Sequence, residues 1–193
     1  MLGYKIIDQL IAISTPEQAK VTSSFFKTQK GEYAENDIFL GVSVPQIRKV
    51  VAPYLQLELT EVSTLLHSKY HESRFAALVI LNHQFDKGDE AQRKIIYHFY
   101  LDNTQYIDNW DLVDVSAHKI VGAWLIDKGK EPLYKLANSS WLWDQRIAIV
   151  ATWAFIRNHQ FEDTLSLSKH YMNHPHHLIN KACGWMLREV GKR

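Results

Sequence analysis

The sequence contains only one cysteine, Cys183, so an internal disulfide is excluded. It also lacks any apolar run near the ~20 residues that a membrane-spanning helix needs. Its first residues lead into an amphipathic segment and not into the apolar core of a signal peptide. From these absences we expect a protein of the reducing cytoplasm with no membrane partner.

Helix-breaking residues are scarce, with five prolines and eight glycines among 193 residues. Apolar residues instead recur at helical spacing, in one stripe within residues 110–125 and another within residues 147–155. This pattern predicts roughly ten to twelve short helices and no strand. Breaks are expected near residues 87–89, 127–130 and 174–176, and Pro45 suits the first turn of a helix. We expect one domain over residues 1–193.

The two signs of charge nearly balance, because 22 Lys and Arg stand against 21 Asp and Glu for a net charge of +1. Nucleic-acid binders draw much of their affinity from phosphate neutralisation, so this balance alone does not predict DNA binding. If DNA is the partner, the basic residues must gather on one face.

Signatures of several common chemistries are missing: there is no HExxH, no CxxC, no phosphate-binding glycine loop and no Gly-x-Ser-x-Gly. The histidines within residues 174–177 are interpreted as part of a solvated turn and not as a metal site. We interpret His67 and His71 as surface or packing residues, and Cys183 as a small packing residue. No metal and no cofactor are expected.

An internal repeat of similar segments organises the chain. Arg74, Arg146 and Lys181 each open a segment of small and apolar residues, and Asp111 opens a related one. Asp111 and Arg146 are 35 residues apart, as are Arg146 and Lys181, while Arg74 and Asp111 are 37 apart. This period is typical of HEAT-like helix pairs; a tetratricopeptide array has a similar period, but its Trp, Leu-Gly and Tyr signature is missing. The predicted fold is therefore an all-α solenoid of HEAT-like helix pairs with a concave cleft.

Residues that are in phase across stacked repeats line one surface. Trp110 and Asp114 are four apart and share a helix face, and Arg146 and Trp185 are in phase with them in later repeats. Taken singly, each has a structural explanation as a core tryptophan, a helix-dipole partner or an inter-repeat hydrogen bonder. Two indoles, a carboxylate and a guanidinium on one surface together indicate a functional site.

Four segments that include these residues resemble the AlkD-like DNA alkylation-repair family. They are FLGVSVPQIRK at residues 39–49, WDLVD at 110–114, WDQRIAI at 143–149 and KACGWMLRE at 181–189. They follow one another over nearly the whole chain, which makes the resemblance more specific than any one motif. The resemblance implies a HEAT-like fold and a glycosylase that hydrolyses the N-glycosidic bond of N3- and N7-alkylated purines in duplex DNA.

The resemblance also implies roles for individual residues. Asp114 and Trp110 match the family's catalytic Asp and Trp, Arg146 its active-site Arg, and Trp185 its second cleft Trp. A third cleft aromatic falls on Phe25 or on its neighbour, Phe26.

The chemistry of the lesion agrees with these residue types. An N3- or N7-alkylated purine is cationic, so it is already a good leaving group and needs no general acid. An ionised Asp114 would stabilise the oxocarbenium charge that grows on the sugar and would orient the attacking water. Indole faces attract the positive base, and Arg146 is expected to meet a phosphate beside the lesion.

Basic residues near the repeat starts and motifs are expected to form a positive stripe along the cleft, with Phe25 beside them. The expected DNA-binding residues are Arg48, Lys49, Arg74, Lys181, Arg188 and Phe25. We expect a monomer that associates with the nucleoid through alkylated double-stranded DNA.

Two other functions are compatible with the same sequence. One is a catalytically silent relative that recognises DNA structure, although such a protein would be free to lose Asp114. The other is a HEAT-like scaffold for protein interactions, which the modest net charge allows. Members of the resembled family continue with further helices beyond this chain's last residues, so a shortened C-terminus without its capping repeat is expected.

Overall fold

The computed structural model describes residues 1–193 and contains two compact units, Met1–Lys87 (unit 1) and Gly88–Arg193 (unit 2). All of its regular structure is helical, and extended backbone pairs only in one isolated bridge between Ile38 and Tyr70. The all-α fold class predicted from the sequence is therefore confirmed. None of the helices combines the length and the apolar character needed to cross a bilayer.

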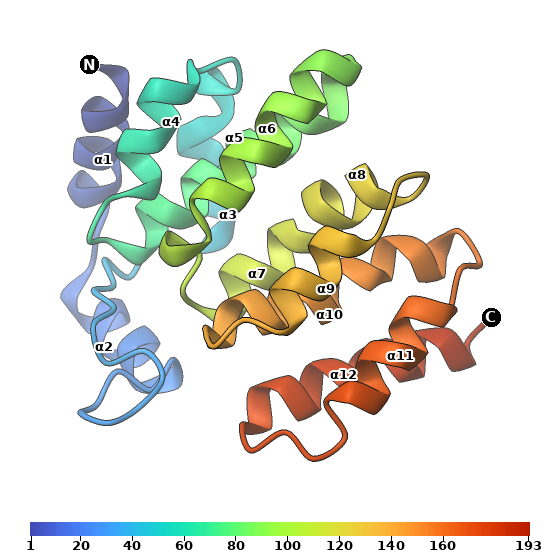
Figure 1. Ribbon diagram of the computed structural model, residues 1–193. Helices are drawn as coiled ribbons and strands as arrows, with labels where there is room; N and C mark the ends of the chain where they lie inside the picture. The colour runs from blue at the N-terminus through green and yellow to red at the C-terminus, as the bar shows by residue number, and fades with distance from the viewer. The chain divides into compact units, whose positions relative to one another are not determined.

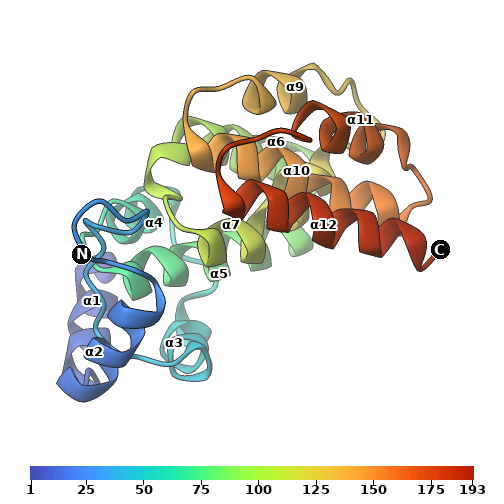
Figure 2. The same cartoon turned by 90° about the horizontal axis from the view of Figure 1, so that it is seen from below.

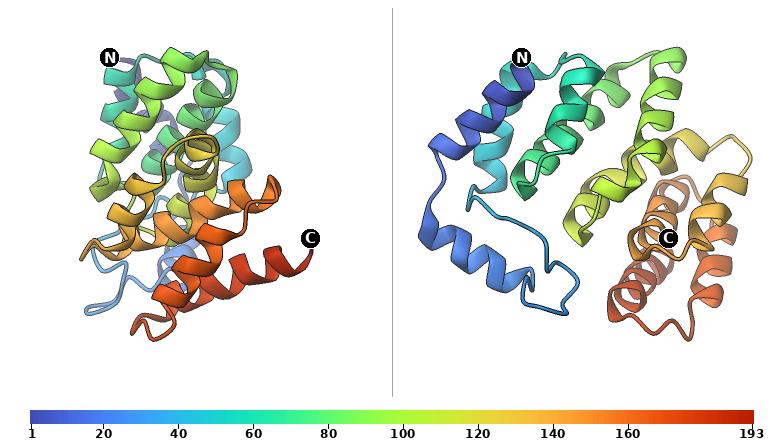
Figure 3. Two further views of the ribbon diagram at one scale, coloured as in Figure 1. Left: turned by 45° about the vertical axis from the view of Figure 1, so that its right-hand side comes forward. Right: turned by 60° about the vertical axis from the view of Figure 1, so that its left-hand side comes forward.

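Unit 1 is built from four short α-helices and one long one around a small apolar core. Its elements are α1 (Leu2–Ala12), α2 (Pro16–Phe25), α3 (Val44–Val51), the 3-10 turn η1 (Ala52–Tyr54), α4 (Leu59–Leu66) and α5 (His71–Lys87). Helix α1 packs on α3, α4 and α5, and α5 also packs on α3 and α4. Helix α2 and the loop after it lie beyond the C-terminal end of α1, at one end of the unit (Figures 1 and 3).

The expected helix start at Pro45 is confirmed. Ser43 is the N-cap of α3, and the Gln46 side chain reaches back to accept the Ser43 backbone N–H at 3.0 Å. This capping box satisfies N–H groups that the first turn of a helix leaves free, and proline suits that turn because it has no N–H to lose.

The loop before α3 is held by a buried carboxylate. Glu72, in the first turn of α5, accepts the backbone N–H groups of Leu40, Gly41 and Val42 at 2.9 to 3.2 Å. Gly41 has a positive φ of 76°, and a Cβ there would lie 2.3 Å from the backbone nitrogen of Ala19 in α2. Only glycine fits, so the 39–49 motif serves to join α2, α3 and α5.

Unit 2 is arranged around one long helix, α10 (Leu142–Arg157). The other elements are α6 (Glu90–Asp102), η2 (Thr104–Tyr106), α7 (Trp110–Ala117), the π-helical η3 (His118–Gly122), α8 (Ala123–Leu125), α9 (Glu131–Ala137), α11 (Glu162–His170) and α12 (His177–Gly191). Helix α10 packs against α7, η3, α9, α11 and α12. Figure 2 shows α9 and α11 together on one side of α10 and α12. The predicted breaks are confirmed, and the helix pairs agree with the repeat, whereas the solenoid stays a prediction.

The stripe expected within residues 110–125 follows one helical path through α7, η3 and α8, but its middle is a π-helix. Gly122 closes this segment, and a Cβ there would lie 2.1 Å from the Ala151 carbonyl oxygen of α10. The two backbones therefore approach each other closely at this point. A π-helical turn interrupts the α-helical register and is frequent near functional sites. This one directly follows α7, the helix that carries Asp114.

Candidate functional site

The centre of the candidate site is an ion pair between two helices of unit 2. Asp114 of α7 accepts two hydrogen bonds from Arg146 of α10, from Nε to Oδ1 at 3.0 Å and from Nη2 to Oδ2 at 2.8 Å. The remaining guanidinium nitrogen, Nη1, donates to the carbonyl oxygen of Leu178 in α12 at 2.6 Å. One guanidinium thus joins three helices and fixes the plane of the carboxylate.

The two partners differ in exposure. The Arg146 side chain is 6% exposed, whereas the Asp114 side chain is 22% exposed. Burial raises the pKa of the Asp114 carboxyl above its ordinary value, and the charge and hydrogen bonds of Arg146 act in the opposite direction. The result is a carboxylate that is paired on one edge and open to solvent on another.

The structure does not agree with the phosphate contact expected of Arg146. Its guanidinium is buried, and all three of its nitrogens already donate to Asp114 and Leu178. A buried guanidinium whose three nitrogens each donate a hydrogen bond would lose these partners if it turned toward a phosphate. The structure therefore shows Arg146 as the bidentate hydrogen-bond partner of Asp114.

Both predicted tryptophans are half-buried in unit 2. Trp110 is the first residue of α7, one turn before Asp114, and its backbone N–H is capped by the Asn109 side chain at 2.8 Å. Trp185 lies on α12, two turns after Leu178, and its ring packs on Trp153 with ring centroids 5.2 Å apart. The site helices thus bring Asp114 and Arg146 into contact, with Trp110 on the same helix face as Asp114.

Sequence reasoning missed two further aromatic residues near this site. The His118 ring packs on Trp153 with centroids 4.5 Å apart, which makes a row of His118, Trp153 and Trp185. Burial, together with the charges of Lys119 and Arg157, lowers the pKa of His118 to about 4. A signal was present, because His118 follows Asp114 by four residues and Trp153 follows Arg146 by seven, and both spacings keep a side chain on one helix face.

Most of the predicted DNA-binding residues are exposed. Arg48 and Lys49 are exposed on α3 in unit 1, and Lys181 and Arg188 are exposed on α12 in unit 2. Basic side chains in this state are available to phosphates. The stripe that would combine them stays a prediction.

Arg74 differs from these residues and is a correction to the prediction. Its side chain is 6% exposed, and its guanidinium pairs with Asp37 and donates to the Ser68 carbonyl oxygen at 3.1 Å. Asp37 also contacts His71 Nδ1 at 3.1 Å, so the packing role expected of His71 is what the structure shows. Arg74 belongs to a buried network of unit 1 and not to a surface that DNA can reach.

The two neighbouring phenylalanines have opposite environments. Phe25 is 65% exposed, whereas Phe26 is 8% exposed and packs on Phe39 and His71, with centroids 4.8 and 5.2 Å away. Phe26 is therefore a core residue. Of the pair, Phe25 is the one with a face available for a ligand.

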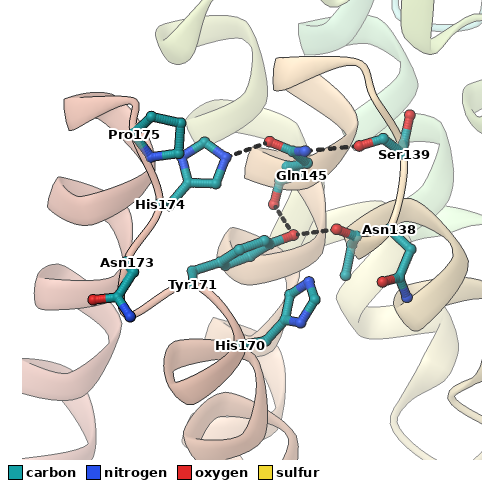
Figure 4. A pocket seen from close by; sticks show the side chains of 9 residues that line it. Asn138, Ser139, Gln145, His170, Tyr171, Asn173, His174 and Pro175 are labelled. Atoms are coloured by element: carbon teal, nitrogen blue, oxygen red, sulfur yellow. Dashed lines mark hydrogen bonds between the residues drawn. The ribbon is translucent and has the colours of Figure 1, made fainter.

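A polar pocket of about 330 Å³ lies elsewhere in unit 2, between the ends of α9, α10 and α11 (Figure 4). The Tyr171 hydroxyl lies within hydrogen-bond distance of the Ala137 and Gln145 carbonyl oxygens, and the Gln145 side chain contacts His174 at 2.9 Å. Its polar groups therefore largely satisfy one another. No group of three or more His, Cys, Asp or Glu side chains is placed to hold a metal ion, and burial raises the pKa of Cys183 to about 11, as suits a packing residue.

Comparison with known proteins adds independent information. The model of the family described as DNA alkylation repair enzyme matches residues 6–193. A solved structure described as a predicted DNA alkylation repair enzyme from Enterococcus faecalis is similar in fold, with a TM-score of 0.68 and 16% identity over 93% of this chain and 84% of that one. None of the curated proteins matches. Because the family model covers nearly the whole chain, this protein belongs to the DNA alkylation repair enzyme family.

Proposed function

We propose that this protein is a monofunctional DNA glycosylase that hydrolyses the N-glycosidic bond of cationic N3- and N7-alkylated purines in duplex DNA. The observation that carries the proposal is the Asp114 carboxylate, held on one edge by Arg146 and open to solvent on another. Membership of the DNA alkylation repair enzyme family supports a substrate of this kind.

Asp114 would act on the sugar and not on the base. A cationic purine leaves as a neutral molecule, so positive charge builds up mainly on the deoxyribose in the transition state. A fixed, partly desolvated carboxylate stabilises that charge without reorganising, and its free edge can orient the attacking water. Arg146 weakens the net field of Asp114, but it holds the carboxylate in one orientation, which favours a reaction that depends on positioning.

Trp110 and Trp185 would bind the base. A positive purine against an indole face gains about 0.5–2 kcal/mol, depending on how far water is removed. Both side chains are half-buried, which leaves part of each ring available. Neutral damaged bases such as uracil should be poor substrates, since no general acid accompanies Asp114. No lysine accompanies it in the motif either, so no abasic-site lyase activity is expected.

Phe25 and the exposed basic residues would supply the contact with duplex DNA. Arg48, Lys49, Lys181 and Arg188 are each exposed and can neutralise phosphates. They would give affinity without reading the sequence of bases, as suits an enzyme that must find lesions in any context.

The test is single-turnover release of 7-methylguanine from methylated duplex DNA. Asp114→Asn keeps the shape and removes the charge, so excision should slow by about a hundredfold to a thousandfold, with little change in affinity for DNA. Asp111→Asn is the matched control, because Asp111 is a half-buried carboxylate on the same helix and accepts a hydrogen bond from the Leu112 backbone N–H.

The outcomes separate the alternatives. Equal rates for wild type and Asp114→Asn would remove Asp114 from the mechanism. Tight binding to alkylated duplex without release of a base would identify a silent DNA-binding relative. Failure to bind duplex DNA at low salt would favour a protein-interaction scaffold.

A further inference from the structure

An aromatic row crosses three helical segments of unit 2 beside the Asp114–Arg146 pair. His118 of η3 packs on Trp153 of α10, and Trp153 packs on Trp185 of α12 at an interplanar angle of 59°. Asp114 precedes His118 by one helical turn and Arg146 precedes Trp153 by two. The Arg146 hydrogen bonds connect the three segments at Asp114, Arg146 and Leu178. The row connects them again one or two helical turns later in each segment, so the three segments run in the same direction. The row therefore lies further along the surface that holds the ion pair.

Trp153 is not explained by packing alone. Its indole nitrogen is buried and has no hydrogen-bond acceptor. An unpaired buried donor is unfavourable, and a phenylalanine would fill most of the same space without one. The larger and more electron-rich indole ring is an advantage over phenylalanine if its π surface stabilises the residue that packs against it.

What lies against it is Trp185, a half-buried residue with one side of its ring supported by Trp153. A partly exposed tryptophan can adopt several rotamers, and only one of them aligns the ring with a cation above it. A tilted aromatic neighbour at 5.2 Å restricts those rotamers.

Resting on the proposed function, we propose that Trp153 is a positioning residue that holds the ring of Trp185 against the cationic purine. His118 packs on Trp153 at the other end of the row. Because its pKa is lowered to about 4, His118 is neutral at physiological pH and brings no positive charge toward the bound cation. Trp153 itself touches Trp185 and not the substrate.

This role has a specific signature. Loss of Trp153 should reduce the excision rate at saturating enzyme and the preference for a cationic base, and should leave affinity for undamaged duplex unchanged. A merely structural residue would lower the folded fraction, which would weaken the apparent affinity for undamaged and cationic duplexes alike and leave the preference between them unchanged.

The experiment compares wild type, Trp153→Leu and Trp153→Phe with Trp124→Leu as the matched control. Trp124 is a half-buried tryptophan of the same unit that stacks on Tyr97 with centroids 5.5 Å apart, away from the row. Each protein is assayed for single-turnover excision of 7-methylguanine. Each is also titrated with DNA duplexes that carry either 2′-deoxy-2′-fluoroguanosine or its 7-methyl derivative, which is cationic and resists hydrolysis. The exciton circular dichroism of the Trp153–Trp185 pair reports on the row itself.

We expect Trp153→Leu to slow excision by about tenfold and to reduce the preference for the cationic duplex by a similar factor, the size of one lost aromatic or cation–π contact. Trp153→Phe should recover part of both, because it keeps a smaller and less electron-rich π face, and Trp124→Leu should change neither. If Trp153→Leu does not fold, Trp153→Met takes its place with the same criteria, because methionine fills irregular core space but offers no π face.

Equal rates and equal preference in Trp153→Leu and wild type would overturn the inference. If wild type excises the base and Asp114→Asn does not, equality of Trp153→Leu and wild type overturns the role of Trp153 alone, and the proposed function stands. If wild type neither excises the base nor prefers the cationic duplex, the proposed function fails, and the role of Trp153 fails with it.

Discussion

Two aspartate–arginine pairs, one in each unit, use the same residue types differently. In unit 1 the side chains of Asp37 and Arg74 are 3% and 6% exposed, and Asp37 also contacts His71. In unit 2 the arginine is equally buried, but its aspartate is 22% exposed. The arginines themselves are alike, since each lies in the first turns of a long helix, α5 or α10, and they are in phase in the sequence repeat.

The comparison shows that exposure of the aspartate, and not the presence of the pair, separates a structural from a candidate catalytic residue. Asp37 is enclosed by its partners and can only hold the loop to α5. Asp114 is paired on one edge and reachable on the other. The repeat provides an arginine in both units, and the surroundings of the carboxylate decide what the pair can do.

The largest effect should come from removing each arginine. Arg74→Met leaves the enclosed Asp37 charge without its main partner, so the free energy of unfolding should fall by about 3–5 kcal/mol. Arg146→Met should cost less, because water already reaches Asp114. Urea unfolding of both variants measures the difference, with Lys87→Met as the exposed control on α5. Equal losses for the two arginines would contradict the assignment of different environments.

Acid should destabilise the protein through His118 of unit 2. The ordinary histidine pKa is 6.5 and the pKa of folded His118 is about 4, so between these values the unfolded chain binds a proton that the folded protein does not. Stability should therefore fall as pH decreases from about 6.5 to about 4, by on the order of 3 kcal/mol. His118→Phe should flatten that part of the curve in urea unfolding at pH 7 and pH 4.5. An unchanged curve would mean that other groups dominate the acid response.

A smaller effect should follow from exchanging arginine for lysine. Arg146→Lys keeps the positive charge but loses the bidentate hydrogen bonds to Asp114. Excision should therefore slow by about tenfold, because the carboxylate is positioned less well. Arg74→Lys makes the same exchange in unit 1 and should leave the rate of the folded protein unchanged. Single-turnover assays below the unfolding temperature test both. A similar slowing in the two variants would mean that the effect is general and not local to Asp114.

The smallest effect concerns salt. With about 4–6 phosphate contacts, the log–log dependence of DNA affinity on salt should have a slope of about −4 to −5, and Lys181→Ala should make it shallower by about 0.9. Arg74→Met removes a cation at a similar position of the repeat and should leave the slope as in wild type, because Arg74 is buried. Titrations at several salt concentrations decide this. A change of slope in Arg74→Met would restore Arg74 as a DNA contact.

Much of the fold could be predicted because helix signals are local. The breaks at residues 87–89 and 174–176 and the start at Pro45 depend on nearby glycine, proline and capping residues, and the structure has them where expected. The π-helical segment has no such local signal, and the close approach of Gly122 to α10 at its end is a contact between distant parts of the chain.

The candidate site was also predictable where the signal is local and not where it depends on tertiary contacts. The shared face of Trp110 and Asp114 follows from helical spacing, and the contact of Asp114 with Arg146 agrees with their phase in the repeat. Sequence spacing could not tell Arg74 from Lys181, since the aspartate that buries Arg74 lies 37 residues away in a loop. Likewise, only tertiary packing shows that Phe26 is in the core and that Phe25 is exposed.

The hydrogen bond from Arg146 to the Leu178 carbonyl oxygen determines when the site can form in a nascent chain. On the ribosome, a chain that ends before α12 already contains Asp114 and Arg146, but the third bond of the guanidinium is not yet made and Trp185 is absent. The arginine would then be free to turn away from the carboxylate. The complete arrangement exists only after α12 has emerged and packed on α10, so an unfinished chain would lack the third bond that fixes Arg146 and, through it, the Asp114 carboxylate.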